Sequence, residues 1–338
     1  MKSVLFEMML NVMMRMMAGK RYYGERAEET RRFRDLVTET FTVNGATNLA
    51  DFLPVVRWMG VGGMEKRLVA LQVKRDAFAQ GLVDERRGRG GGGEEAEGRN
   101  KTMLEVLLGL QAEEPEYYTD EIIKGIMLLR ILLSLANLLA AGIDASIATM
   151  EWTLSLLLNN PDHLKKEQAE MDKYVRQDRL VEVSDIAHLP YLRCIMNKAS
   201  RMPSTGPHES SQECTVEGYR IPADTMLLVN MWAIQNDPKI WEDPRKFKPE
   251  RFEGLEGSRD GFKFVQFGYG RRLCPGESLA MRVVGLALGS LLQCFEWERP
   301  GKEMVDMTEG PGLITPKVQP LVAKCRPRPR MVKLLSQI

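Results

Sequence analysis

The chain has 338 residues, of which 44% are hydrophobic and 28% charged, and its formal net charge at pH 7 is +1. This balance is typical of a globular protein with a large core and gives no indication of binding to nucleic acid. An odd number of cysteines without paired spacing argues against a disulfide framework and favours a reducing compartment; they are Cys194, Cys214, Cys274, Cys294 and Cys325.

Two apolar stretches are candidates for membrane spans. Residues 2–17 are interrupted by Glu7 and Arg15, are too short to cross a bilayer and lack the cleavage site of a signal peptide, so they predict an amphipathic core helix. Residues 126–142 contain Arg130, which is costly in lipid, so a buried helix is favoured over a transmembrane span.

The first part of the chain predicts helices interrupted at residues 45–56 and 59–63. Residues 86–100 are rich in glycine and charge, which predicts a flexible surface loop. A G-x-G-x-x-G pattern occurs there at Gly88, Gly90 and Gly93, but no strand precedes it, so a nucleotide-binding loop is not expected.

Helical periodicity continues further along the chain. One long helix is predicted from Asp120 to about Leu158, ending before Pro161, and a second begins with Asp162 near its N-terminus. Residues 184–201 also predict helix.

The period then changes to two in residues 214–222 and 225–233, which predicts a small hairpin or sheet. A last apolar helix is expected from Gly276 to Phe295. The predicted fold class is therefore mainly α with a minor β-sheet.

The stretch "FGYGRRLCPGESLA", residues 267–280, places Cys274 directly ahead of this last helix. Free backbone N–H groups at the helix N-terminus and the cations Arg271 and Arg272 favour the thiolate over the thiol. Such a cysteine is a metal ligand or a nucleophile, although a nucleophile needs a base and the nearest histidine in sequence is His208. The alternative of a buried, inert cysteine is what we expect of Cys194 and Cys294.

The same stretch resembles the haem-binding loop of cytochrome P-450, F-x-x-G-x-R-x-C-x-G, at Phe267, Gly270, Arg272, Cys274 and Gly276. The resemblance implies that Cys274 is the proximal ligand of the iron of haem b, a thiolate ligation known for this family. It also implies that Arg272 pairs with a haem propionate and that Phe267 packs beside the ring. Gly268, Gly270 and Gly276 would let the backbone approach this flat cofactor.

The resemblance extends over nearly the whole chain. Residues 138–161 look like the long distal helix of the family, and residues 249–252 match its P-E-R-F element. Other segments resemble plant microsomal members of the isoflavone hydroxylase type. The implied fold is a cytochrome P-450 fold lacking its N-terminal part and its membrane anchor. Residues 1–338 would form one partial domain with a flexible loop at 86–100.

The distal helix departs from the family pattern in one position. In the family, a threonine follows an acid, and the two groups relay protons during catalysis. In this chain Asp144, two residues after Gly142, is the acid, and Ala145 stands in the place of the threonine. Ser146 lies about 100° further round the helix and is a poor substitute for the missing hydroxyl. We therefore expect weak coupling of electron transfer to product formation.

A second departure concerns charge. The family's E-x-x-R motif corresponds here to Lys198 and Arg201, and with Arg251 the buried network would hold three cations and no evident anion. Removing one partner of a buried pair costs about 3–5 kcal/mol. The alternative is that Lys198 reaches solvent at a lower cost. The segment after Arg201 is also shorter than in the family, which alters the expected substrate pocket.

The resemblance implies a haem-thiolate monooxygenase that hydroxylates a small apolar or aromatic plant metabolite, isoflavonoid-like, with O₂. Electrons would come from NADPH through NADPH–cytochrome P-450 reductase. The expected location is the cytosolic face of the endoplasmic reticulum membrane or, for a chain without its anchor, the cytoplasm. The alternative is a truncated, degenerate family member that binds haem weakly or not at all and has no catalytic activity.

Overall fold

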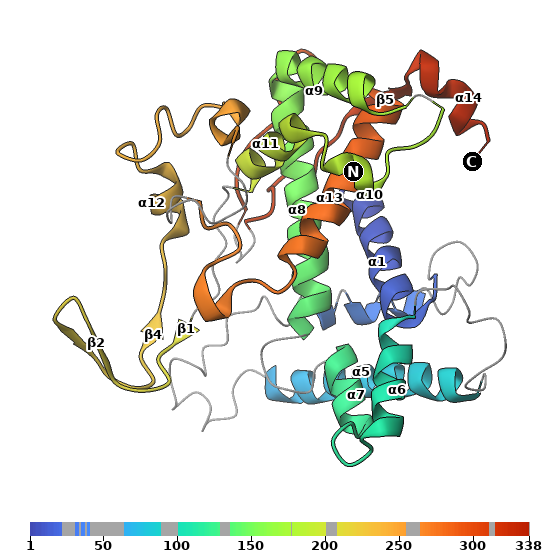
Figure 1. Ribbon diagram of the computed structural model, residues 1–338, viewed down its shortest axis with the longest axis vertical. Helices are drawn as coiled ribbons and strands as arrows, with labels where there is room; N and C mark the ends of the chain where they lie inside the picture. Colours follow the sequence, from blue (N-terminus) through green and yellow to red (C-terminus); the bar gives the residue numbers. More distant parts are fainter. Residues whose placement is uncertain are drawn as a thin grey trace. The chain divides into compact units, whose positions relative to one another are not determined.

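The computed structural model describes residues 1–21, 31–33, 35–37, 39–40, 64–88, 101–128, 136–176, 178–200, 208–254, 264–310 and 315–337. They form two compact units, of which one is Ser3–Ala145 and the other is Ser146–Ile338 with Met1–Lys2 (Figure 1). Helices dominate the described chain, and the strands make small antiparallel sheets. The predicted fold class is confirmed.

The unit Ser3–Ala145 is helical in its described part. It contains most of α1 (Lys2–Ala18), α5 (Met64–Gly88), α6 (Met103–Glu113), α7 (Asp120–Leu128) and the first part of α8 (Ala136–Asn159). The buried side chains of α1 follow a helical spacing and are Leu5, Met9, Leu10, Met13, Met14 and Met17. The prediction of an amphipathic core helix at the start of the chain is confirmed.

Arg87 joins three helices of this unit. Its guanidinium donates to Asp120 Oδ2 of α7 at 2.8 Å and to Gln111 Oε1 of α6 at 2.7 Å. The hydrogen bonds from Arg87 and Gln111 hold the pKa of the Asp120 carboxyl well below its usual range. Because α5 continues to Gly88, the predicted loop 86–100 is wrong for its first three residues; residues 89–100 lie outside the described chain, as do the predicted interruptions at 45–56 and 59–63.

The other unit contains the rest of α8 and the remaining helices. These are α9 (Pro161–Tyr174), α10 (Val183–Ile186), α11 (Pro190–Ala199), α12 (Met231–Asn236), α13 (Glu277–Cys294), α14 (Val332–Leu335) and the short 3₁₀ turns η2 (Pro249–Phe252), η3 (Gly270–Arg272) and η4 (Pro329–Met331). The predicted end of α8 before Pro161 is confirmed, and proline starts the next helix because its missing N–H is not needed there. Helix α13 packs against α9, α10 and α11. None of the helices that the structure describes is both long and apolar enough for a membrane span.

Three two-stranded antiparallel sheets complete this unit. They pair β1 (His208–Glu209) with β4 (Met226–Leu227), β2 (Cys214–Val216) with β3 (Tyr219–Ile221), and β5 (Phe295–Glu298) with β6 (Lys324–Pro327). Residues 214–222 form a hairpin by themselves, β2–β3, whose two central residues, Glu217 and Gly218, have φ values of 50° and 83°. The two predicted segments do not pair with each other, because β4 of the second segment pairs with β1. The strand predicted over 225–233 is wrong beyond Leu227, because the Asn230 side chain accepts from Ala233 N–H and caps α12.

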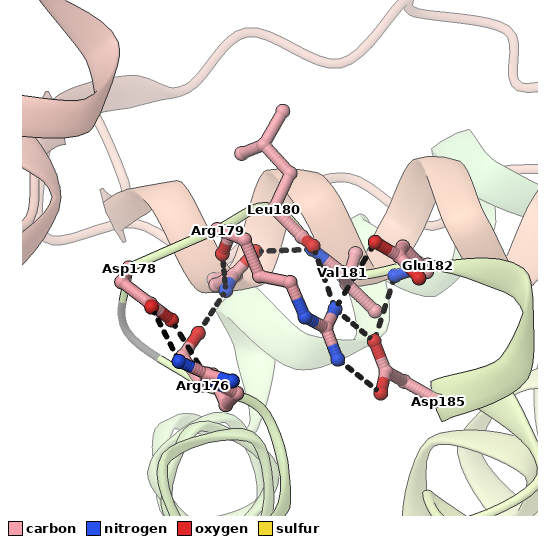
Figure 2. A network of polar contacts seen from close by, with 8 residues as sticks. Arg176, Asp178, Arg179, Leu180, Val181, Glu182 and Asp185 are labelled. Carbon is pink, nitrogen blue, oxygen red and sulfur yellow. Dashed lines mark hydrogen bonds and ion pairs between the residues drawn. The ribbon is translucent and has the colours of Figure 1, made fainter.

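A polar network fixes the C-terminal end of α13. The buried side chain of Gln293 accepts from Val181 N–H at 2.9 Å and donates to Arg179 O at 3.0 Å. Beside it, Arg179 forms two hydrogen bonds with the Asp185 carboxylate at 2.6 and 2.9 Å (Figure 2). These bonds satisfy the backbone of the loop between α9 and α10, so α13 has a defined position against both helices.

Candidate functional site

Cys274 lies in a closed turn ahead of α13. Its backbone N–H donates to the carbonyl of Phe267 at 2.8 Å, and the N–H of Leu273 donates to Gly270 O at 3.1 Å. Gly276 is the N-cap residue of α13, so Cys274 stands two residues before the cap. The predicted placement of this cysteine ahead of a helix N-terminus is therefore confirmed.

Glycine is required at two positions of this turn. Gly268 has a φ of +76° and Gly270 a φ of +71°, a region that side chains with a Cβ rarely adopt. A Cβ added to Gly270 would meet no atom within 4 Å, and one added to Gly268 would meet only Arg272 O, at 3.8 Å. At Gly276, a Cβ would lie 3.7 Å from Cys274 Sγ. The turn thus leaves open space next to Gly270. Because residue 276 is glycine, no side chain at that position contacts the Cys274 sulfur.

The environment of Cys274 differs from that of two other cysteines. Cys274 is exposed and free, whereas Cys194 and Cys294 are buried. Burial raises the pKa of the Cys194 thiol to about 11, with smaller contributions from nearby carboxylates, and burial also raises the pKa of Cys294. The prediction that Cys194 and Cys294 are buried is confirmed. Cys214 and Cys325 are exposed as well, so exposure alone does not distinguish Cys274.

Two cations lie in the turn beside the thiol. Arg271 and Arg272 belong to η3 and are exposed, while Phe267 is partly buried. The predicted residues Phe267, Gly268, Gly270, Arg272, Cys274 and Gly276 are thus brought together by one turn and the cap of one helix.

Sequence reasoning missed the residues that support the turn from inside. Phe264 and Val265 precede it and are buried, and Val265 O accepts from Gly268 N–H at 3.0 Å. Phe264 belongs to a cluster of buried residues, named here the Phe264 cluster, that also contains Cys194, Trp241 and Phe252. The density of aromatic residues in "FKFVQF", residues 262–267, was the signal for such a support.

The distal-helix residues lie in α8, within the unit Ser3–Ala145. Asp144 and Gly142 are partly buried, Ala145 is exposed and a Cβ on Gly142 would lie 3.7 Å from Met13 Cε. Ser146 is buried, so it faces a different side of the helix from Ala145. This difference agrees with the expectation that Ser146 does not replace a hydroxyl at position 145.

The cations that were expected to lack an anionic partner donate hydrogen bonds to backbone carbonyls. Lys198 Nζ donates to Pro244 O at 3.1 Å. The Arg251 guanidinium donates to Glu242 O at 2.7 Å, Asp243 O at 3.0 Å and Lys248 O at 3.1 Å. Arg201 lies outside the described residues. The acceptors of Lys198 and Arg251 are neutral carbonyl oxygens of residues 242–248, so the expectation of a cation network without an evident anion stays a prediction.

A mainly α fold with an exposed cysteine turn ahead of a long helix is the arrangement expected of a haem-thiolate protein. A sequence model of the cytochrome P450 family matches residues 1–323. The chain belongs to the cytochrome P450 family.

Several known proteins are similar to this chain. The (+)-piperitol/(+)-sesamin synthase of Sesamum radiatum is 46% identical over 345 residues, which cover 100% of this chain and 64% of the synthase. The isoflavone 2'-hydroxylase of Glycyrrhiza echinata is 43% identical over 344 residues, covering 99% of this chain and 65% of that protein. The chain therefore spans slightly less than two thirds of these plant relatives.

A solved structure confirms the fold. A zebra fish cytochrome P450 with progesterone superposes with a TM-score of 0.77 at 26% sequence identity, covering 97% of this chain and 71% of that chain. The predicted cytochrome P-450 fold and the resemblance to isoflavone hydroxylases are confirmed. Family membership implies haem b as the cofactor.

The residues of the turn fit this cofactor. The structure provides one exposed free thiol, two glycines with positive φ that border open space, and two exposed arginines in the same turn. A flat porphyrin that supplies four nitrogen ligands needs only one ligand of this kind from the chain below it. Among the residues that the structure describes, no cluster of three or more His, Cys, Asp or Glu forms an alternative metal site.

Proposed function

We propose that this chain carries the cysteine-ligand half of a plant monooxygenase that hydroxylates a small apolar or aromatic secondary metabolite of isoflavonoid type. The observation that supports it most directly is the exposed Cys274 thiol in a glycine turn ahead of α13. The hydroxylase and synthase names of the plant relatives support the reaction class. The overall reaction would convert substrate, O₂, NADPH and a proton into hydroxylated product, water and NADP⁺.

Haem b, when bound, supplies the activation of O₂. Cys274 would hold the iron through its sulfur, the thiolate ligation known for this family. Arg272 would bind a propionate as a charge-assisted pair. Phe267 would pack beside the ring, and Gly268, Gly270 and Gly276 would keep side chains away from it.

The proposed proton donor is Asp144 of α8. A carboxylate can pass protons from solvent, but Ala145 next to it carries no hydroxyl to continue the transfer. Gly142, two residues earlier, carries no side chain, and a Cβ there would lie 3.7 Å from Met13 Cε. Where proton delivery to the reaction is poor, the two electrons of NADPH would reduce O₂ with two protons to hydrogen peroxide, and the yield of product per NADPH would be low.

NADPH–cytochrome P-450 reductase is the proposed electron donor, and the cytosolic face of the endoplasmic reticulum membrane is the proposed location. Both rest on membership of the family and on the plant relatives.

The alternative is that the chain has no catalytic function and is a degenerate family member that binds haem weakly. Two observations favour it. Ala145 lacks the hydroxyl, and both carboxylate oxygens of the fully buried Glu167 have no hydrogen-bond partner among the described residues.

The absorption spectrum of the reduced, carbon monoxide-bound protein separates the two functions. Thiolate ligation moves the Soret band far to the red, and this band should be present in the wild type and absent in Cys274→Ala. Cys325→Ala, which removes another exposed cysteine, is the matched control and should keep the band. Circular dichroism verifies that each variant is folded. A wild-type protein without the band would overturn the proposed enzyme, and a Cys274→Ala variant with an unchanged band would overturn the ligand.

A further inference from the structure

Helix α11 contacts a residue that precedes the cysteine turn and the helix that follows the turn. On the side that precedes the turn, Cys194 of α11 belongs to the Phe264 cluster. On the side that follows it, a Cβ added to Gly285 of α13 would lie 3.7 Å from Met196 Sδ of α11 and 3.1 Å from Ile186 Cγ2. Helix α13 therefore approaches α10 and α11 closely at this point. The two α11 residues in these contacts, Cys194 and Met196, are two positions apart in the sequence.

Aromatic contacts link the residues on the side that precedes the turn. The rings of Trp241 and Phe252 have centroids 5.7 Å apart at 44°, and those of Phe252 and Phe264 lie 5.0 Å apart at 53°. All three side chains are buried, with exposed fractions of 7%, 2% and 2%. Tilted aromatic pairs of this kind are favourable and restrict the orientation of each ring. Phe252 therefore fixes where Phe264 can lie.

Hydrogen bonds fix Phe252 in turn. Arg251, its neighbour in η2, donates to carbonyls of Glu242, Asp243 and Lys248, which closes the segment between Trp241 and Phe252 on itself. The ends of this segment thus cannot separate without breaking charge-assisted bonds.

The link from Phe264 to the thiol runs through short backbone contacts. Val265, next to Phe264, accepts from Gly268 N–H at 3.0 Å, and Phe267 accepts from Cys274 N–H at 2.8 Å. A shift of Phe264 would therefore move the carbonyl that holds the Cys274 backbone. Core packing passes such shifts on because buried side chains have little free volume.

We propose that Phe252 and Phe264 are positioning residues for Cys274, setting the place of its sulfur through the Phe264 cluster. The inference rests on the proposed function only for the identity of the group that the Cys274 sulfur binds. The position of the thiol itself is a property of the chain without cofactor, and it can be measured there.

The first test uses the full chain reconstituted with haem. Phe264→Leu and Phe252→Leu keep an apolar residue but remove the ring contacts; Leu157→Ala, a fully buried residue of α8 outside the cluster, is the control for loss of stability. In the reduced, carbon monoxide-bound spectrum, the intensity ratio of the red-shifted thiolate band to the unshifted band should be about threefold lower, or more, in both aromatic variants than in the wild type. Leu157→Ala should keep the wild-type ratio even if its melting temperature is as low as that of the aromatic variants. Equal ratios in all variants would overturn the proposal.

The second test uses the haem-free chain in a Cys214→Ser, Cys325→Ser background, in which Cys274 is the one exposed cysteine of the described chain. The rate of alkylation of Cys274 by iodoacetamide should change by about threefold or more in Phe264→Leu and stay at the background value in Leu157→Ala. Equal rates in the two variants would overturn the positioning role. If the wild type shows no thiolate band, the proposed function fails, and this second test still decides the inference.

Discussion

Lys198 of α11 donates a hydrogen bond from Nζ to the backbone carbonyl of Pro244 at 3.1 Å. The acceptor lies between residues whose carbonyls already bind the Arg251 guanidinium, since Arg251 donates to Asp243 O at 3.0 Å and to Lys246 O at 3.4 Å. Two cations thus share one stretch of backbone. The carbonyls are neutral, and a carboxylate at position 198 would add an anion near the Arg251 guanidinium, on which the charges of Asp243 and Glu242 already act.

Lys198→Glu should raise the free energy of unfolding, by about 1–3 kcal/mol, because it places an anion near the backbone segment that binds the Arg251 guanidinium. Thermal melting measures this change, and haem content after reconstitution should rise with it. Lys198→Gln, which keeps a donor for Pro244 O but removes the charge, is the control and should fall between the two. A lower melting temperature in Lys198→Glu would show that the Pro244 contact stabilises the fold more than the added anion does.

Glu167 should make the stability depend on pH. The side chain is fully buried on α9, between Leu164 and Met171, and neither carboxylate oxygen has a hydrogen-bond partner within the described chain. Desolvation raises the pKa of this carboxyl well above its ordinary value, and the charges of Glu170 and Asp172 add to the effect. In the folded state the group therefore keeps its proton at a pH where the unfolded chain has lost it.

The sign follows from this difference in bound protons. The contribution of Glu167 to stability is fully present below the unfolded pKa, near 4.5, and is lost as pH rises from there through the raised folded pKa, by up to about 1.4 kcal/mol per pH unit. Glu167→Met should remove this slope and melt at a higher temperature than the wild type at pH 8. Asp162→Asn, an exposed carboxylate on the same helix, should leave the slope unchanged. Parallel pH profiles for wild type and Glu167→Met would contradict the assignment.

Gly270→Ala should weaken both the fold and haem binding. Its φ of +71° costs a residue with a Cβ about 1–2 kcal/mol, although the added methyl group would meet no atom within 4 Å. Gly301→Ala is the matched control, because that position is equally open and its φ is outside the left-handed region. It should be neutral or slightly stabilising. Denaturant unfolding of both variants measures the difference, and equal effects would show that backbone strain is not the reason for glycine at 270.

Ala145→Thr should improve coupling if the chain is an active monooxygenase. The residue is exposed on α8, so a hydroxyl can be added next to Asp144 at the small helical cost of a β-branched residue, about 0.5 kcal/mol. Product formed per NADPH should increase and hydrogen peroxide should decrease. Ala148→Thr, about one helical turn later, should change neither quantity. Tight coupling in the wild type would contradict the loss of function assigned to Ala145.

Local patterns were sufficient for much of this protein. The helix that ends before Pro161 and the cysteine ahead of α13 follow from neighbouring residues, because proline, glycine and helix caps act within one turn. The motif around Cys274 was recognisable for the same reason. The strand predicted beyond Leu227 failed because its apolar residues suit either structure and the Asn230 cap decided for helix.

The sequence by itself determined that a cysteine with glycines and arginines stands before a helix, and hence the family and the cofactor. Only the tertiary structure decided that Lys198 and Arg251 share the carbonyls of one segment, that Glu167 is buried without a hydrogen-bond partner in the described part of the chain, and that Phe252 lies against Phe264. These contacts join residues that are distant along the chain. Their energy depends on burial and on which partners are brought within reach, and neither is set by the local order of residues.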